Sequence, residues 1–235
     1  MLDGADPWAS FQTAATAAKC GGDWLAERAG FPPDPVRGDL ERRGFAFLSE
    51  EDVLRCRDTL RLATRSIEQE PGLAAIVNAE VSAVFLLSAG EAFDISHSEP
   101  RWPGWVFVSV PSAPGEVSAL RAAENIVHEA LHHQLTRIED RVALVADLES
   151  KLASPWKNEP RHMQGILHGL YVFVCISRFF ERLRDAGAVG EEGTAYVDRR
   201  LTEIGEEVRA VSLGELKSGL TPNGQAFLRK LCWRH

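Results

Sequence analysis

The sequence has few cysteines, no surplus of basic residues and no long hydrophobic run, and each shortage excludes a class of protein. Its four cysteines, Cys20, Cys56, Cys175 and Cys232, are widely scattered and form no CxxC pair. This distribution is unlike a disulfide framework and indicates a reducing compartment. Acidic residues outnumber basic ones by 34 to 26, and the net charge of −8 argues against nucleic acid as a partner.

No segment predicts a membrane span or a secretion signal. The longest apolar run, AVFLLSAG from residue 83, follows the polar residues Asn78 and Glu80 and is too short to cross a bilayer. The first ten residues, MLDGADPWAS, are acidic and lack the apolar stretch of a signal peptide. We therefore expect a cytoplasmic protein without a membrane partner.

The sequence does contain helical periodicity over most of its length. Hydrophobic residues make up 45% of the chain, which suits one large domain or a domain with a small appendage. Residues 1–36 hold a short helical pattern and then a proline-rich break, FPPDPVRG, and we interpret them as an N-terminal helical arm. We expect residues 37–235 to form a single domain.

The predicted fold is mostly α with a small β-sheet, an α+β class. Ser49 with Asp52 resembles a helix start, and Pro71-Gly72 resembles a helix stop. WVFVSV, Trp105 to Val110, is the best strand in the chain. KLASPWKNEPRH reads as a loop, because prolines interrupt it. The predicted helices cover residues 49–70, 73–88, 117–150 with an interruption allowed, 163–184, 192–212 and 223–233.

HEALHH, His128 to His133, contains the HExxH spacing of many zinc peptidases. On a helix, His128 and His132 point to the same side one turn apart, and Glu129 projects beside them. Two imidazoles so placed can hold one metal ion. A short pattern also arises by chance, and the alternative is an amphipathic helix whose border histidines are satisfied by hydrogen bonds.

A functional metal site needs a third ligand. The metzincin spacing requires Gly at position 135 and His at position 138, where this chain has Leu135 and Ile138, so that class is excluded. His168, in the apolar stretch ILHGLYVFV, is the candidate, since Gly165 and Gly169 let a second helix or an ion come close. A lone histidine on an apolar face is more often a satisfied core residue, so this alternative stays open.

The other histidines point less clearly to a site. His133 lies about 100° around the helix from His132, so contact with the ligands, contact with substrate and plain surface are all open. His97 is expected in a loop, from which it either reaches the site or has no part in it. His162 is ambiguous, and His235 is expected to be exposed at the end of the chain.

Two stretches together resemble a known family. ENIVHEALHHQL and LASPWKNEPRHMQGILHGLYVFV are similar to the HExxH-motif family that modifies ribosomally made peptide natural products, over roughly residues 94–184. The SPW…PR…GxLHGxY pattern is more specific than HExxH itself. The resemblance implies an Fe(II)/α-ketoglutarate-dependent oxygenase that β-hydroxylates a residue of a precursor peptide. It also implies a helical metalloenzyme domain distinct from the cupin barrel.

The chemistry of such an enzyme assigns further residues. His128, His132 and His168 would hold iron and leave positions open for the keto acid and O₂. Three neutral imidazoles depart from the usual two-histidine, one-carboxylate set, and Glu129 beside the ion would offset its charge or hold a water molecule. The chain also departs from the family pattern at two positions near the predicted co-substrate pocket, which are often Arg and Pro and here are Lys157 and His162.

The distal carboxylate of α-ketoglutarate needs a cation, and arginine suits it best because it can donate two parallel hydrogen bonds. Arg161 lies seven residues before His168, about two helical turns, and is the favoured partner, with Lys157 as a helper. Arg101 and Arg121 are alternates. The plain alternative for both Arg161 and Lys157 is a solvated loop.

Two other functions remain open at the level of sequence. A zinc-dependent peptidase or hydrolase would use the same histidines, with Glu129 as general base. It would contain zinc and need no keto acid. A binding protein whose metal site has decayed is the third possibility, and the intact spacing of the ligands argues against it.

Overall fold

The computed structural model describes residues 23–89, 94–111 and 113–232. The structure is 61% helix, with a small mixed four-stranded sheet and a two-stranded hairpin, which confirms the predicted α+β class. The chain divides into two compact units, residues 1–130 and 131–235. The first 22 residues of the predicted arm lie outside the described residues, and the predicted boundary at residue 36 falls inside helix α3 (Asp34–Arg42).

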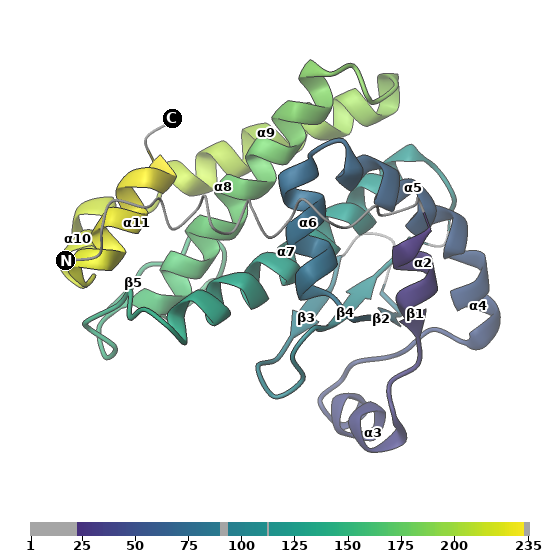
Figure 1. The fold of residues 1–235 in the computed structure, drawn as a ribbon, viewed down its shortest axis with the longest axis horizontal. Coiled ribbons are helices and arrows are strands. Elements are labelled where there is room, and N and C mark those ends of the chain that lie inside the picture. Colours follow the sequence, from purple (N-terminus) through teal and green to yellow (C-terminus); the bar gives the residue numbers. More distant parts are fainter. Residues whose placement is uncertain (1–22, 90–93, 112, 233–235) are drawn as a thin grey trace. The chain divides into compact units, whose positions relative to one another are not determined.

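A four-stranded sheet lies at the centre of the first unit (Figure 1). In spatial order its strands are β1 (Ala29–Gly30), β2 (Ala83–Leu87), β4 (Trp105–Ser109) and β3 (Ser96–Ser98). The first three run parallel, and β3 pairs antiparallel with β4 at the edge. The predicted strand from Trp105 is confirmed, and it ends one residue earlier than expected.

Strand β2 shows that the predicted helix over residues 73–88 is wrong in its second half. Helix α6 (Pro71–Glu80) ends before the run AVFLL, which forms a strand between β1 and β4. Four of its five residues are buried, so the run is continuously apolar and has the same sequence signature as a buried helix. The helix before it ends at Glu68, close to the predicted stop, and Pro71 then begins α6, as suits the first turn of a helix.

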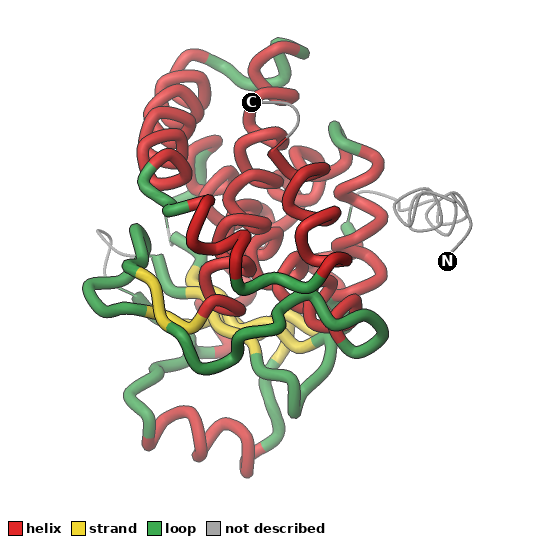
Figure 2. The backbone as a smooth tube through the Cα atoms, turned by 90° about the vertical axis from the view of Figure 1, so that its left-hand side faces the viewer, coloured by secondary structure: helices red, strands yellow, loops and turns green. Residues whose placement is uncertain are grey.

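Helices lie on both faces of the sheet in the first unit (Figures 1 and 2). On one face, Leu40 of α3 packs against Phe85, Leu87 and Phe107. These three side chains share a face because alternate residues of a strand point the same way. Helices α2 (Trp24–Arg28), α5 (Arg57–Glu68) and α6 lie on the opposite side in Figure 1.

Proline begins α3, where the sequence suggested only a break. Pro33 is its N-cap residue and Pro35 lies in its first turn, where a missing backbone N–H costs nothing. The predicted helix over residues 49–70 is two helices, α4 (Glu50–Arg55) and α5, which separate at Cys56. The predicted cap is confirmed, since the Asp52 amide donates to Ser49 Oγ over 3.2 Å.

The second unit is built on helix α8 (Met163–Asp185), which matches the predicted helix within one residue. It also contains α9 (Glu191–Arg209), α10 (Leu213–Ser218) and α11 (Pro222–Cys232). Among the described helices, α8 is the one that is long and apolar enough to cross a membrane, by length and composition alone. Of its most apolar stretch 67% is buried within the structure, and a core helix of a soluble protein meets the same criteria.

Helix α7 (Glu116–Glu139) continues from the first unit into the second and ends earlier than predicted. A helix to residue 150 was expected, with an interruption allowed. The backbone after α7 instead bonds to a distant segment: the Ala146 amide donates to the Gly219 carbonyl over 2.8 Å, and Val145 pairs with Leu220. The predicted loop before α8 contains a short hairpin, β5 (Lys151–Leu152) with β6 (Arg161–His162).

Candidate metal site

Helix α7 carries the HEALHH stretch in its second half. His128 and His132 are both half-buried and lie one turn apart on this helix. One face of this helix is apolar and is buried except at Ile138, which is half-buried. The fully buried members are Leu120, Ala123, Val127, Ala130 and Leu131.

In the second unit, His132 and His168 lie side by side. Their Nδ1 atoms are 3.1 Å apart, and the rings stack with centroids 5.4 Å apart and an interplanar angle of 18°. Two nitrogens that bind one ion at about 2.1 Å are roughly 3.0–3.4 Å from each other. The pair therefore has the spacing of two ligands of a common ion, and also that of a hydrogen bond in which one imidazole donates to the other.

Glu139, the last residue of α7, contacts the other side of the His168 ring. Its Oε2 lies 2.9 Å from His168 Nε2, and each side chain is only 12% exposed. Gln164 Nε2 donates to the same oxygen over 2.7 Å. A carboxylate at this place favours the proton on Nε2, which leaves the lone pair of His168 Nδ1 directed at His132.

Sequence reasoning missed Glu139, although a signal was present. It follows His132 by seven residues, so the two side chains lie on the same side of α7 about two turns apart.

The second unit thus supplies two imidazoles that can act as metal ligands, and one carboxylate that orients the His168 ring. Across residues 23–89, 94–111 and 113–232, no three His, Cys, Asp or Glu side chains gather closely enough to hold an ion. Imidazole is a donor that Fe(II) and Zn(II) both accept, so the pair fits either metal. The assignment of His128 as the third ligand stays a prediction.

Both glycines beside His168 make room for side chains from the preceding loop and hairpin. A Cβ on Gly169 would lie 2.5 Å from a ring carbon of Trp156. The indole stacks on Phe173 with centroids 5.3 Å apart, and its buried Nε1 has no hydrogen-bond partner among the described residues. The glycines were expected to admit a helix or an ion. At Gly169 the close neighbour is Trp156.

Arg161 lies over the other glycine. Its Nε is 3.5 Å from the place that a Cβ on Gly165 would take. Gly165 precedes His168 by three residues, so the two positions lie on neighbouring turns of the same side of α8. Arg161 and Lys157 are exposed, and neither side chain makes an ion pair within the part of the chain that the structure describes. Both cations are therefore available to an anion.

The alternate arginines are already paired with carboxylates. Arg121 lies 2.9 Å from Asp94, and Arg101 bonds to both Glu99 and Asp39. The structure gives the exposure of two other histidines that the sequence analysis named. His162 is exposed at the start of α8, His133 is half-buried, and His235 lies outside the described residues.

In the first unit, Glu129 is buried at 4% exposure and meets strand β3. Ser98 Oγ donates a hydrogen bond to Glu129 Oε2. The segment DISHSEP was expected to be a loop, but its pairing with β4 makes it an edge strand. Sequence reasoning missed Ser98, because no local pattern links positions 98 and 129.

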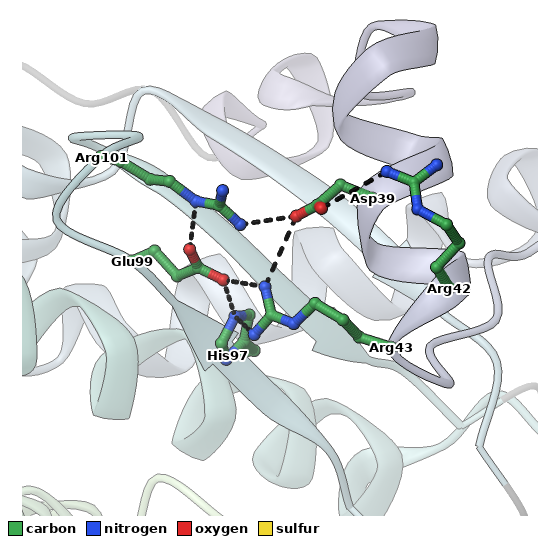
Figure 3. A network of polar contacts seen from close by, with 6 residues as sticks. All are labelled: Asp39, Arg42, Arg43, His97, Glu99 and Arg101. Carbon is green, nitrogen blue, oxygen red and sulfur yellow. Dashed lines mark hydrogen bonds and ion pairs between the residues drawn. The ribbon is translucent and has the colours of Figure 1, made fainter.

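The two residues that flank Ser98 belong to a network of six charged or polar side chains (Figure 3). Its members are Asp39, Arg42, Arg43, His97, Glu99 and Arg101. Burial by itself raises the pKa of Glu99, but hydrogen bonds from Arg43, His97 and Arg101 outweigh it and lower that pKa to about 2. His97 Nε2 lies 2.8 Å from Glu99 and 3.5 Å from a guanidinium nitrogen of Arg43, the C-cap residue of α3, so His97 takes part in the contact between β3 and the end of α3.

Comparison with protein-family models and with curated proteins finds no match to this chain. The chemistry and geometry of its own residues therefore carry the functional argument.

Proposed function

We propose that the chain is an Fe(II)/α-ketoglutarate-dependent oxygenase that hydroxylates the β-carbon of a residue in a ribosomally made precursor peptide. The protein would be a helical, non-cupin metalloenzyme. The observation that supports this most is the facing pair of His132 and His168, with Glu139 behind His168. Histidines that bind metals commonly donate their other N–H to a carboxylate. His128, one turn before His132 on α7, is the third ligand of the proposal.

The charge of the proposed metal site favours a dianionic co-substrate such as α-ketoglutarate. Three neutral imidazoles leave both positive charges of Fe(II) uncompensated, so a dianionic keto acid gains affinity at such an ion. Arg161 would bind the distal carboxylate through two parallel hydrogen bonds, and Lys157 would add a second positive charge. The exposure of both side chains and their lack of ion pairs within the described chain support this assignment.

The bound iron would supply the activation of O₂, with one oxygen atom inserted into the peptide C–H bond and the other into succinate as CO₂ leaves. The residues of the chain would bind and orient. Glu139 would hold the His168 ring in its ligating orientation, and Glu129 would hold a water molecule or offset charge.

Metal binding is the first test. Under anaerobic conditions, Fe(II) should bind the wild-type chain with a stoichiometry of one and bind far more weakly to His132→Ala and His168→Ala. His133→Ala is the matched control, because it removes an adjacent histidine that has no assigned ligand role. Adding α-ketoglutarate should then produce a visible charge-transfer band. Equal Fe(II) affinity in all four proteins would refute the ligand assignment.

A zinc-dependent peptidase or hydrolase is the second candidate function. The buried carboxylate of Glu129 favours it, because a general base needs an oxygen that is held in place and open to a water molecule. This function predicts cleavage of peptides by the zinc-loaded chain without keto acid. Glu129→Gln would then abolish activity, whereas the oxygenase would keep part of its activity.

A further inference from the structure

Glu129 is a buried carboxylate with a single hydrogen-bond donor in the described chain. That donor is Ser98, whose Oγ bonds to Oε2, while Oε1 bonds to no residue that the structure describes. A carboxylate accepts about four hydrogen bonds when all its lone pairs are used. One oxygen of Glu129 is therefore held in place, and the other is left for a water molecule or a substrate group.

The position of Ser98 is fixed by the pairing of strand β3 with strand β4. It pairs with Val106 of β4, and its neighbours His97 and Glu99 point to the opposite face of β3 because side chains alternate along a strand. On that opposite face, Arg43 and Arg101 both bond to Glu99 (Figure 3). The strand is thus anchored on one face and presents the Ser98 hydroxyl on the other.

We propose that Ser98 is a positioning residue, whose hydroxyl orients the Glu129 carboxylate so that Oε1 faces the reacting groups. This inference rests on the proposed function in that it takes the HExxH stretch to be part of the active site. It applies equally to the oxygenase and to the hydrolase, because both need Glu129 in a defined orientation.

The test compares Ser98→Ala and Ser98→Thr with the control Ser96→Ala in the full chain. Ser96 lies on the same face of β3, and no side-chain hydrogen bond links it to another described residue. Ser98→Ala should lower kcat tenfold or more, on the order expected for a hydrogen bond to a charged group. The KM for peptide and the Fe(II) affinity should stay unchanged. Ser98→Thr, which keeps the hydroxyl, should restore most of kcat, and Ser96→Ala should match wild type.

Crystal structures of the same variants separate a failure of this inference from a failure of the proposed function. If the wild-type chain is inactive both with Fe(II) and α-ketoglutarate and with zinc, the function is wrong. In that case the orientation of the Glu129 side chain in the crystal structures tests the inference. The side chain should rotate in Ser98→Ala and keep its wild-type orientation in Ser96→Ala.

An unchanged Glu129 orientation in Ser98→Ala would overturn the inference, as would an equal loss of kcat in Ser98→Ala and Ser96→Ala. Should Ser98→Ala not fold, Ser98→Cys takes its place, because a thiol of similar size is a weak donor.

Discussion

Replacing Gly169 with alanine should destabilise the chain, although alanine normally favours a helix. A Cβ at this position in α8 would lie 2.5 and 2.6 Å from two ring carbons of Trp156, closer than real Cβ atoms approach. The indole has little freedom to move aside, because it stacks on Phe173 and its Nε1 is buried. At Gly165, one turn earlier, a Cβ would meet Arg161 at an ordinary 3.5 Å.

Two opposing effects set the magnitude. Alanine in place of glycine inside a helix gains about 1 kcal/mol, and overpacking a well-filled site costs about 1–3 kcal/mol. Gly169→Ala should therefore lose up to about 2 kcal/mol of unfolding free energy. Gly165→Ala has no clash and lies in the first turn, so it should change stability by between zero and about +1 kcal/mol.

Urea unfolding followed by circular dichroism measures both variants against the wild-type chain. The difference in unfolding free energy between Gly165→Ala and Gly169→Ala reports the overpacking, because both substitutions add the same methyl group to the same helix. A Gly169→Ala chain at least as stable as Gly165→Ala would refute the packing of Trp156 on α8.

Three further predictions concern charge. The pKa of Glu99 is lowered to about 2, so the stabilisation from its charged form is complete above its ordinary pKa of 4.5 and is lost as the pH falls towards 2. The loss of unfolding free energy amounts to at most about 3 kcal/mol. Glu99→Gln should remove this part of the pH dependence of the unfolding free energy below pH 4.5. An unchanged pH dependence in this variant would contradict the prediction. Arg161→Ala should weaken α-ketoglutarate binding roughly 10–100-fold in anaerobic calorimetry without changing Fe(II) affinity; equal affinity for the keto acid would exclude the residue. Glu139→Gln should weaken metal binding by roughly 10–100-fold, whereas the exposed Glu149→Gln should not, and identical metal affinities would show that Glu139 orients no ligand.

Local patterns were sufficient for some elements and not for others. Helix α8 was predicted within one residue because its apolar stretch is long and prolines precede it. Ser49 was recognised because a cap is made by residues three positions apart. Strand β2 was missed because burial on both faces removes the alternation that marks a strand. The end of α7 was missed because its following backbone bonds to residues near Gly219, about 70 positions away.

The candidate site divides in the same way. The spacing of His128 and His132 follows from the turn of one helix, so it was visible in the sequence. The contact of His132 with His168 joins α7 to α8, and their shared role as metal ligands stays a prediction. The contact of Ser98 with Glu129 depends on the pairing of β3 with β4, which no local pattern encodes.

The most direct test of the oxygenase proposal is the stoichiometry of a single reaction. The Fe(II)-loaded chain is mixed anaerobically with α-ketoglutarate and a library of synthetic peptides, and O₂ is then admitted. The proposal predicts one succinate for each oxygen atom gained by a peptide, and no reaction in His168→Ala. Peptide cleavage by the zinc-loaded chain, with no succinate and no gain of oxygen under Fe(II), would contradict it.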